Sequence, residues 1–237
     1  MVRDPREHLI VALDVPGLPE MRTLLARLGP DVLWYKIGLE LFSAVGPEAV
    51  RVAKGEGKKV FLDLKLHDIP NTVARAVTRG VALGADLVDM HVVAGEEAMR
   101  AAAEALCAAA APECRILGVT VLTSAKRLEG ATPLSSEALV EEVVRRARAA
   151  CDAGLGGVVC PVAATAAVRA QCSDDFAILN PGIRPAGSAR GDQQWIATPA
   201  AAIRAGARWL VVGRPITGEP DPAAAARGVL QEISGAA

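Results

Sequence analysis

Three charged residues, Asp63, Lys65 and Asp68, lie within six positions of one another at the end of an apolar run. The run from Val60 to Leu64 favours a buried strand, and alternate side chains of a strand lie on one face. We therefore expect Asp63 and Lys65 to point together into whatever the strand lines, with Asp68 just past its end. Charges are costly to bury without compensation. A structural ion pair is one explanation of this pattern, and electrostatic or acid–base catalysis is the other.

Eight apolar runs that favour strands alternate with eight segments of helical composition. The predicted strands are Leu9–Val15, Val32–Leu39, Lys59–Leu66, Leu87–Val93, Arg115–Leu122, Gly157–Cys160, Phe176–Asn180 and Trp209–Gly213. The predicted helices are Pro19–Leu28, Pro47–Gly55, Asn71–Leu83, Glu96–Ala110, Ser136–Ala153, Ala163–Gln171, Thr198–Ala205 and Asp221–Ile233. Nearly continuous apolar strands, each followed by a helix, are typical of a parallel sheet. Eight such units predict an α/β fold, a (β/α)8 TIM barrel; an open doubly wound sheet stays possible, because periodicity does not report closure.

The chain is predicted to be a single domain over residues 1–237, because no linker divides it and α/β barrels commonly have this length. Hydrophobic residues make up 51% and aromatic residues only 3%, so the core must be aliphatic. A formal net charge of −1 predicts neither nucleic acid nor an anionic membrane as a partner. The charged segment Met1–His8 does not resemble a signal peptide, and no apolar stretch is long enough to cross a bilayer. We expect a soluble, cytoplasmic protein.

Neither a metal nor an organic cofactor is predicted. The five cysteines are an odd number without CxxC spacing, and the three histidines are scattered, so no ligand set for a metal stands out. The first strand-to-helix turn, Leu13–Gly17, lacks the glycine-rich dinucleotide fingerprint.

Polar residues gather at one end of the predicted strands. A barrel has its active site at the carboxyl ends of the strands, and this is where the polar side chains fall. They are Asp14 after the first strand, Lys36 on the second, Asp63, Lys65 and Asp68 on and after the third, Thr123 and Ser124 after the fifth, Asn180 to Gln193 after the seventh, and Gly213 and Arg214 after the eighth. The opposite ends carry ordinary turn residues, so this distribution predicts the site.

The last two loops predict a phosphate site. Loops after strands seven and eight bind phosphate in many barrels through backbone N–H groups. Gly213 allows a close backbone approach and Arg214 offers a bidentate contact. The segment from Pro181 to Gln193, which contains three glycines, is expected to be a lid. The alternative for Arg214 is an arginine on the surface without a ligand, and the alternative for the lid is a solvated loop.

These residues together resemble orotidine 5′-monophosphate decarboxylase of the bacterial type, from about residue 9 to residue 216. The DxKxxD element alone is shared with phosphosugar decarboxylases and synthases of the same superfamily, whereas its extension and the two late loops are specific. The matching motifs are Leu13-Asp14, Lys36-Ile-Gly38, Asp63-Leu-Lys-Leu-His-Asp-Ile-Pro-Asn-Thr72, Val121-Leu-Thr-Ser124, Pro181-Gly-Ile-Arg-Pro185, Gly191-Asp-Gln193 and Val212-Gly-Arg-Pro215.

The resemblance implies decarboxylation of orotidine 5′-monophosphate to uridine 5′-monophosphate, a step of pyrimidine biosynthesis, without metal or organic cofactor. Loss of carbon dioxide leaves a carbanion in the plane of the pyrimidine ring, which the ring π system cannot delocalise. The ammonium of Lys65 is suited to stabilise and then protonate it. Asp63 would lie near the departing carboxylate, Asp68 near Lys65, and Lys36 between Asp63 and the ribose.

The same resemblance implies the substrate contacts and the assembly. Family members are homodimers with shared active sites, in which the loop after the third strand reaches into the partner's site through Asp68 and Thr72. The implied contacts are Asp14 with the ribose, Thr123 and Ser124 toward the base, Gln193, Gly213 and Arg214 with the phosphate, and Arg184 in the lid.

Two other functions stay open at this point. A phosphosugar decarboxylase or hexulose-phosphate synthase of the same superfamily would bind Mg²⁺ through an acidic residue on the second strand, where this chain has Lys36. A non-catalytic barrel that binds a phosphate ligand is the second alternative, because fold does not determine function.

Overall fold

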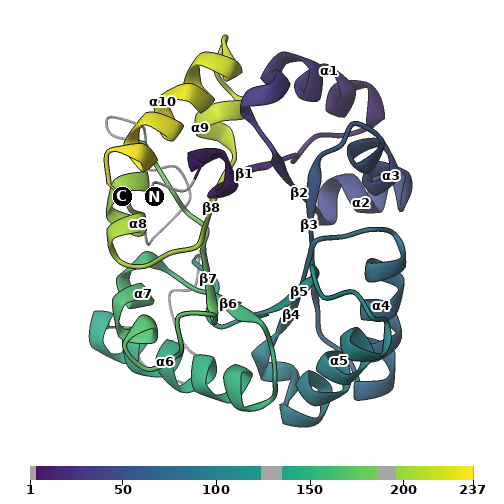
Figure 1. Cartoon of the computed structure of the whole chain (residues 1–237), viewed down its shortest axis with the longest axis vertical. Helices are drawn as coiled ribbons and strands as arrows, with labels where there is room; N and C mark the ends of the chain where they lie inside the picture. Colours follow the sequence, from purple (N-terminus) through teal and green to yellow (C-terminus); the bar gives the residue numbers. More distant parts are fainter. Residues whose placement is uncertain (1–3, 124–134, 186–195, 237) are drawn as a thin grey trace.

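The strands form one closed parallel barrel. The computed structural model describes residues 4–123, 135–185 and 196–236. Eight strands pair in chain order and the last pairs with the first, which closes the ring in Figure 1. They are β1 Leu9–Ala12, β2 Trp34–Gly38, β3 Lys59–Leu66, β4 Leu87–His91, β5 Arg115–Val119, β6 Gly157–Val159, β7 Ala177–Asn180 and β8 Trp209–Val212. The predicted (β/α)8 barrel is confirmed, and the open sheet is excluded.

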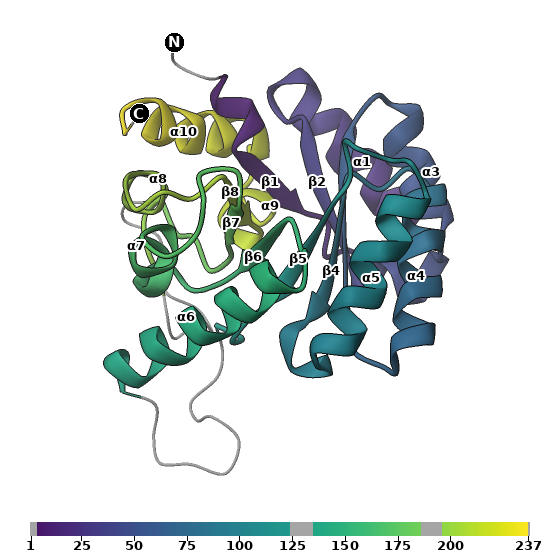
Figure 2. The ribbon, with the colours of Figure 1, turned by 60° about the horizontal axis from the view of Figure 1, so that its bottom comes forward.

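Helices surround the barrel and shield its outer face (Figure 2). In the described residues they are α1 Leu18–Leu28, α2 Leu39–Val45, α3 Glu48–Gly55, α4 Pro70–Ala82, α5 Glu96–Ala108, α6 Ser136–Asp152, α7 Val162–Arg169, α8 Pro199–Arg204, α9 Arg214–Thr217 and α10 Pro222–Ser234, with 3-10 turns η1 Pro5–Glu7, η2 Gly29–Asp31 and η3 Val92–Ala94. Three of these helices begin at a side-chain cap, from Ser135, Thr198 and Asp221.

The eight predicted helices are all present, and two short ones were not predicted. Helices α2 and α9 directly follow Gly38 and Gly213, where the prediction continued the strand to Leu39 or left a loop. The predicted strands β1, β2, β4, β5, β6 and β8 also ran past the observed ends by one to three residues. These extra residues form the rim of the barrel, where apolar side chains continue although the backbone has left the sheet.

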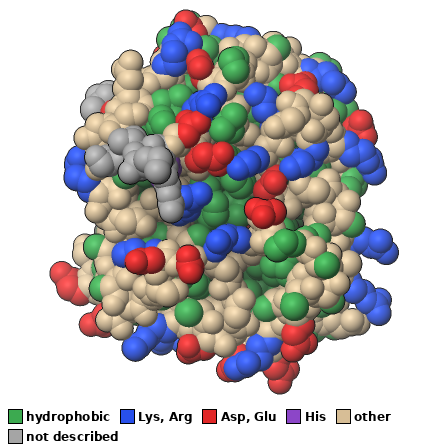
Figure 3. All heavy atoms as spheres, viewed as in Figure 1, with side chains coloured by type: hydrophobic (Ala, Val, Ile, Leu, Met, Phe, Trp, Pro, Cys, Tyr) green, Lys and Arg blue, Asp and Glu red, His purple; other side chains and the backbone are tan. Residues whose placement is uncertain are grey.

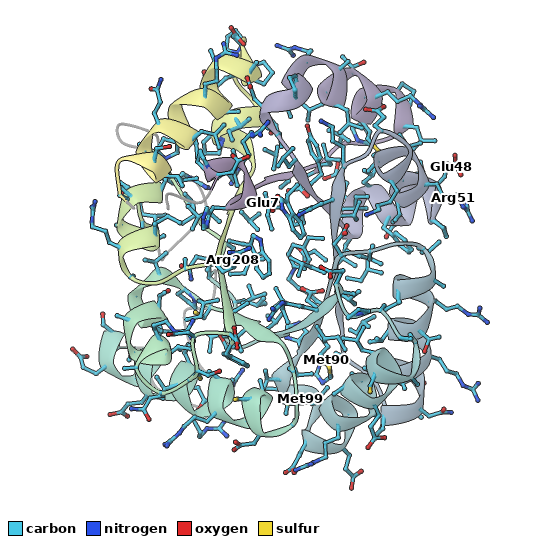
Figure 4. All side chains as sticks on the ribbon, viewed as in Figure 1. Glu7, Glu48, Arg51, Met90, Met99 and Arg208 are labelled. Carbon is cyan, nitrogen blue, oxygen red and sulfur yellow. The ribbon has the colours of Figure 1, made fainter. Side chains whose placement is uncertain are left out.

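Strand side chains alternate between two apolar layers, as parallel strands buried on both faces require. Outward side chains pack against the helices; Met90 on β4 and Met99 on α5, both labelled in Figure 4, belong to that layer. Inward side chains form a second, smaller cluster made of Ile10, Ala12, Trp34, Phe61, Leu87, Leu117, Val119, Val159, Ala177, Leu179, Trp209 and Val211. The inner cluster fills the barrel and supports whatever lies above it.

The amino end of the barrel is closed by aromatic and charged side chains. The rings of Trp34 and Trp209 lie 5.6 Å apart between centroids. The Trp34 indole donates to Glu7, which also pairs with Lys59 at 3.0 Å. Glu7 and Arg208 both lie at this end in Figure 4, and Figure 3 shows hydrophobic side chains at the centre of this face with charged groups around them. These contacts indicate that the amino end stabilises the fold, so we look for a ligand site at the carboxyl end.

Among the described residues, no helix is both long and apolar enough to cross a membrane.

Candidate active site

Inward-facing polar residues lie directly above the inner cluster, the apolar side chains that fill the barrel. Because the strand period is two, the inner residues Trp34 and Phe61 place Lys36 and Asp63 on the same face, one step nearer the carboxyl end. Asp14 likewise follows Ala12. The sequence prediction that these charges gather at one end of the barrel is confirmed by their contacts.

Lys36 joins two carboxylates. Its Nζ lies 2.8 Å from Asp14 Oδ1 and 3.4 Å from Asp63 Oδ2. The Lys36 side chain is only 11% exposed, whereas that of Asp14 is 53% exposed. Burial lowers the pKa of Lys36, but the charges of Asp63 and Asp14 outweigh burial and raise it. Lys36 is therefore a fixed cation between a buried carboxylate and one that faces the open mouth.

Gly38 leaves the space that Lys36 occupies. A Cβ at this position would lie 2.5 Å from Lys36 Nζ and 3.4 Å from Asp14 Oδ1. The backbone of Gly38 is extended, with φ −98° and ψ −173°, so the glycine is needed for space and not for its conformation. The glycine of the Lys-Ile-Gly motif is thus explained by the space that the Lys36 ammonium needs.

Asp63 forms a second ion pair, with Lys65. Lys65 Nζ donates to Asp63 Oδ1, and the Lys65 side chain is 31% exposed, so the ammonium reaches toward the mouth. Burial raises the pKa of Asp63, but a hydrogen bond from Asp89 and the charges of Lys36 and Lys65 lower it below its usual range. The arrangement is an alternating series of charges, Asp14, Lys36, Asp63 and Lys65, at the carboxyl ends of β1 to β3.

The contact between Asp63 and Lys65 was predicted, but the reason given for it was wrong. The prediction assumed a regular strand. The pairing of β3 with β4 shifts between Leu62 and Leu66, and Lys65 has a left-handed backbone with φ 49°. Left-handed geometry is uncommon for a residue other than glycine. The ammonium therefore meets Asp63 through a bulge in the strand.

Asp89 is a site residue that the sequence analysis missed. It lies on β4 two residues after the inner Leu87, is 1% exposed, and accepts a hydrogen bond of 2.8 Å from the backbone N–H of Lys65. Burial, and then the charge of Asp63, raise the pKa of Asp89 well above its usual value. The signal was present in the sequence, since an Asp in the middle of a buried apolar strand has the same inward parity as Asp63.

Asp68 and Thr72 lie outside this series of charges. Both are exposed, and the Asp68 carboxylate accepts a hydrogen bond from the next backbone N–H, that of Ile69, at 2.7 Å. The expected contact of Asp68 with Lys65 is absent from the ion pairs of the described residues. Within one chain, the structure assembles three of the four predicted catalytic residues and leaves the fourth at the start of α4.

The ends of β7 and β8 bring two arginines together. Arg184 is 9% exposed and donates to the carbonyl oxygen of Ile183 at 2.9 Å. Burial lowers its pKa, and the nearby charge of Arg214 lowers it further. Arg214 is exposed and follows Gly213, the residue before α9. Two cations held close enough to repel each other favour an anionic ligand at this side of the mouth.

The remaining predicted residues divide into described and undescribed ones. Thr123 is 9% exposed, just after β5. Ser124 and Gln193, with most of the predicted lid from residue 186 onward, lie outside the described residues. The roles predicted for Ser124, Gln193 and the lid stay predictions.

Known proteins are similar to this chain both in sequence and in fold. Residues 7–229 match the model of the orotidine 5′-phosphate decarboxylase / HUMPS family. An orotidine 5′-phosphate decarboxylase of Moorella thermoacetica is 48% identical, with 96% of this chain and 92% of the relative covered, and that of Opitutus terrae is 47% identical, with 95% and 97% covered. The crystal structure of the enzyme from Lactobacillus acidophilus superposes with a TM-score of 0.82 at 34% identity and covers 96% of this chain and 99% of that one.

Proposed function

The chain belongs to the orotidine 5′-phosphate decarboxylase / HUMPS family, and we propose that it removes carbon dioxide from orotidine 5′-monophosphate to leave uridine 5′-monophosphate. The observation that carries this proposal is the ion-paired series Lys36, Asp63 and Lys65 at the barrel mouth. Simple binding of a phosphate ligand would not require such closely coupled buried charges.

Lys65 supplies the chemistry that this reaction needs. The bond between C6 of the pyrimidine and the carboxylate breaks, carbon dioxide departs, and the electron pair stays on C6 in the plane of the ring. An ammonium next to C6 stabilises that pair and then donates a proton to it, and solvent returns the proton to the lysine. The partial exposure of Lys65 leaves a path for this return.

Asp63 and Lys36 support Lys65 and the sugar. Asp63 pairs with Lys65 and orients its ammonium toward the mouth, while the charge of Asp63 lies where the substrate carboxylate departs. Lys36 balances Asp63 and, with Asp14, presents a cation and a carboxylate to the ribose hydroxyls. The charge series therefore orients the ribose as well as the reacting carbon, which supports a nucleotide substrate.

The phosphate is assigned to the ends of β7 and β8. Arg184 and Arg214 supply the positive charge, and Gly213 has no side chain to hinder a close approach to its backbone. Thr123 and Ser124 are assigned to the base and Gln193 to the phosphate on the basis of the family motifs alone.

A homodimer with shared sites is part of the proposal. The exposed large apolar side chains of the described residues follow β2, β3, β4 and β5 in turn: Leu39 at 57%, Ile69 at 66%, Val93 at 40% and Leu122 at 43%. They form a stripe along one half of the rim, next to the exposed Asp68 and Thr72. A second copy of the chain placed on this stripe would bury it and bring Asp68 near the other site.

The proposal also covers the domain organisation of the chain and its cellular location. We take residues 1–237 to be one domain. A cytoplasmic location is supported by the five cysteines, which the structure describes as free thiols.

Turnover of orotidine 5′-monophosphate, followed by the loss of its absorbance band, tests the function. We expect full activity after dialysis against EDTA, since Lys36 stands where the Mg²⁺-dependent members of the superfamily have an acidic residue. A phosphosugar substrate assayed in parallel serves as the comparison. Binding of the nucleotide without turnover would favour the non-catalytic barrel, and activity that EDTA abolishes and Mg²⁺ restores would favour the phosphosugar enzymes.

A further inference from the structure

Asp89 is almost completely buried, is ionisable, and has no part in the mechanism above. Only 1% of the residue is exposed, in the middle of the otherwise largely apolar strand β4. Its side chain points into the barrel, between the apolar inner cluster and the ion-paired series. A carboxyl group is expensive to keep there, so its contacts indicate what it does.

Asp89 lies opposite the bulge of β3. Leu62 pairs with Val88 and Leu66 with Met90, so three residues of β3 face the single residue Asp89 of β4. Two residues are therefore extra in β3, and the regular hydrogen bonds between the strands are interrupted at this point.

The side chain of Asp89 replaces the interrupted hydrogen bonds. The backbone N–H of Lys65 donates to Asp89 Oδ1 at 2.8 Å, where a regular strand would offer a carbonyl oxygen. Lys65 needs such support because its left-handed backbone, with φ 49°, is unfavourable for a residue with a side chain. The hydrogen bond fixes the conformation from which the Lys65 ammonium reaches Asp63.

The second oxygen of Asp89 indicates its protonation state. As a carboxylate oxygen, the buried Oδ2 has no hydrogen-bond partner. With a proton it becomes a donor to Asp63, and this hydrogen bond lowers the pKa of Asp63. The charged groups that act on Asp89 are Asp63, which raises its pKa, and Lys65, which lowers it, and burial is the largest influence. One proton on Asp89 thus leaves the negative charge on Asp63.

We propose that Asp89 is a positioning residue whose neutral carboxyl group accepts from the Lys65 backbone and donates to the Asp63 carboxylate. It holds the proton donor and its counter-ion in register across the bulge of β3. This inference rests on the proposed decarboxylation and extends it to a residue that touches no substrate. A neutral Asp89 also keeps the charges alternating in sign, because a second anion beside Asp63 would weaken that alternation.

Two substitutions separate this role from simple packing. Asp89→Asn keeps an acceptor for the Lys65 N–H and a donor for Asp63, and we expect its kcat to stay within about 3-fold of the wild-type value. Asp89→Leu fills a similar volume without either group, and we expect kcat to fall by about 100-fold with KM little changed, because the ribose and phosphate contacts are untouched. Met90→Leu, on the same strand but facing the helices, is the matched control and should keep full activity.

Each result has a defined meaning. An Asn variant as impaired as the Leu variant would overturn the neutral hydrogen-bonding role, and a Leu variant with wild-type kcat would overturn any positioning role. Wild-type enzyme that does not decarboxylate orotidine 5′-monophosphate would instead show that the proposed function has failed.

A measurement without substrate keeps the inference testable if the Leu variant does not fold. The ¹³C resonance of the Asp89 carboxyl group, assigned by its absence in Asp89→Asn, should show the neutral form at pH 7. Ionisation of this group near the ordinary pKa of aspartate would contradict the proposal whatever the enzyme's activity.

Discussion

Replacing Gly38 with alanine should impair catalysis without weakening the fold. The new Cβ would lie 2.5 Å from Lys36 Nζ, and an ordinary contact begins at 3.4 Å, so the ammonium must move by about 0.9 Å. That shift cannot preserve both the 2.8 Å contact with Asp14 and the 3.4 Å contact with Asp63. A misplacement of about 1 Å in an active site lowers the rate by about 100-fold, or about 2.7 kcal/mol in the activation free energy.

The stability of the Gly38→Ala variant should not fall. Its backbone angles are open to any residue, and the atom in the way is the end of a flexible side chain. The loss of glycine also reduces the entropy of the unfolded chain, worth about 0.4–1 kcal/mol in favour of folding.

Steady-state decarboxylation and urea unfolding, run on the same preparations, test this reasoning. Gly228→Ala is the matched control, since a Cβ there meets nothing within 4 Å and the residue lies inside α10. We expect the control to keep full kcat/KM. The steric account of Gly38 is refuted if its alanine variant keeps kcat/KM within about 2-fold of wild type, or if the loss of activity accompanies unfolding.

Three further predictions concern the phosphate, the buried acid and the assembly. Arg214→Ala should lower kcat/KM by about 10- to 100-fold for orotidine 5′-monophosphate and little for orotidine, because a charge-assisted contact contributes about 1.5–3 kcal/mol; equal losses on both would make Arg214 structural. Because the pKa of Asp89 is raised on folding, the folded state holds a proton that the unfolded state releases, and stability is lost as pH rises above the unfolded pKa. The free energy of unfolding of Asp89→Asn, measured in urea, should therefore rise relative to that of wild type by up to about 1.4 kcal/mol per pH unit above pH 4. A difference between the two free energies that does not change with pH would contradict the raised pKa. Mixed Lys65→Ala and Asp68→Ala chains should recover about a quarter of wild-type activity on subunit exchange, since a heterodimer with shared sites has one intact site; with heterodimers verified by mass, an inactive mixture would show that each site is self-contained.

The sequence was sufficient for the fold and for most of the ion-paired series, because both depend on short-range patterns. The strand Lys59–Leu66 was predicted with its observed bounds, and the period of two placed Asp63 above the inner core. Lys36 and Asp14 could be placed at the same edge because parallel strands end together.

What the sequence could not supply depends on contacts between distant residues. The bulge at Lys65 arises from the register between β3 and β4, which no local pattern reports. Asp89 could have been singled out as an Asp within a buried strand, but its role depends on its partner, a backbone N–H 24 residues earlier, which the sequence does not report. The role of Asp68 is not visible in a single chain, where its carboxylate contacts the N–H of Ile69, and testing it requires the proposed dimer.

The rate of orotidine 5′-monophosphate decarboxylation by the Lys65→Ala variant, measured beside wild type, tests the central claim most directly. Lys65 is assigned to the transition state, so we expect turnover to be abolished while urea unfolding and the binding of uridine 5′-monophosphate stay close to wild type. A folded variant that keeps even about a tenth of the wild-type kcat would contradict the assignment of Lys65 as the proton donor, because removing a general acid alone costs about 100-fold or more.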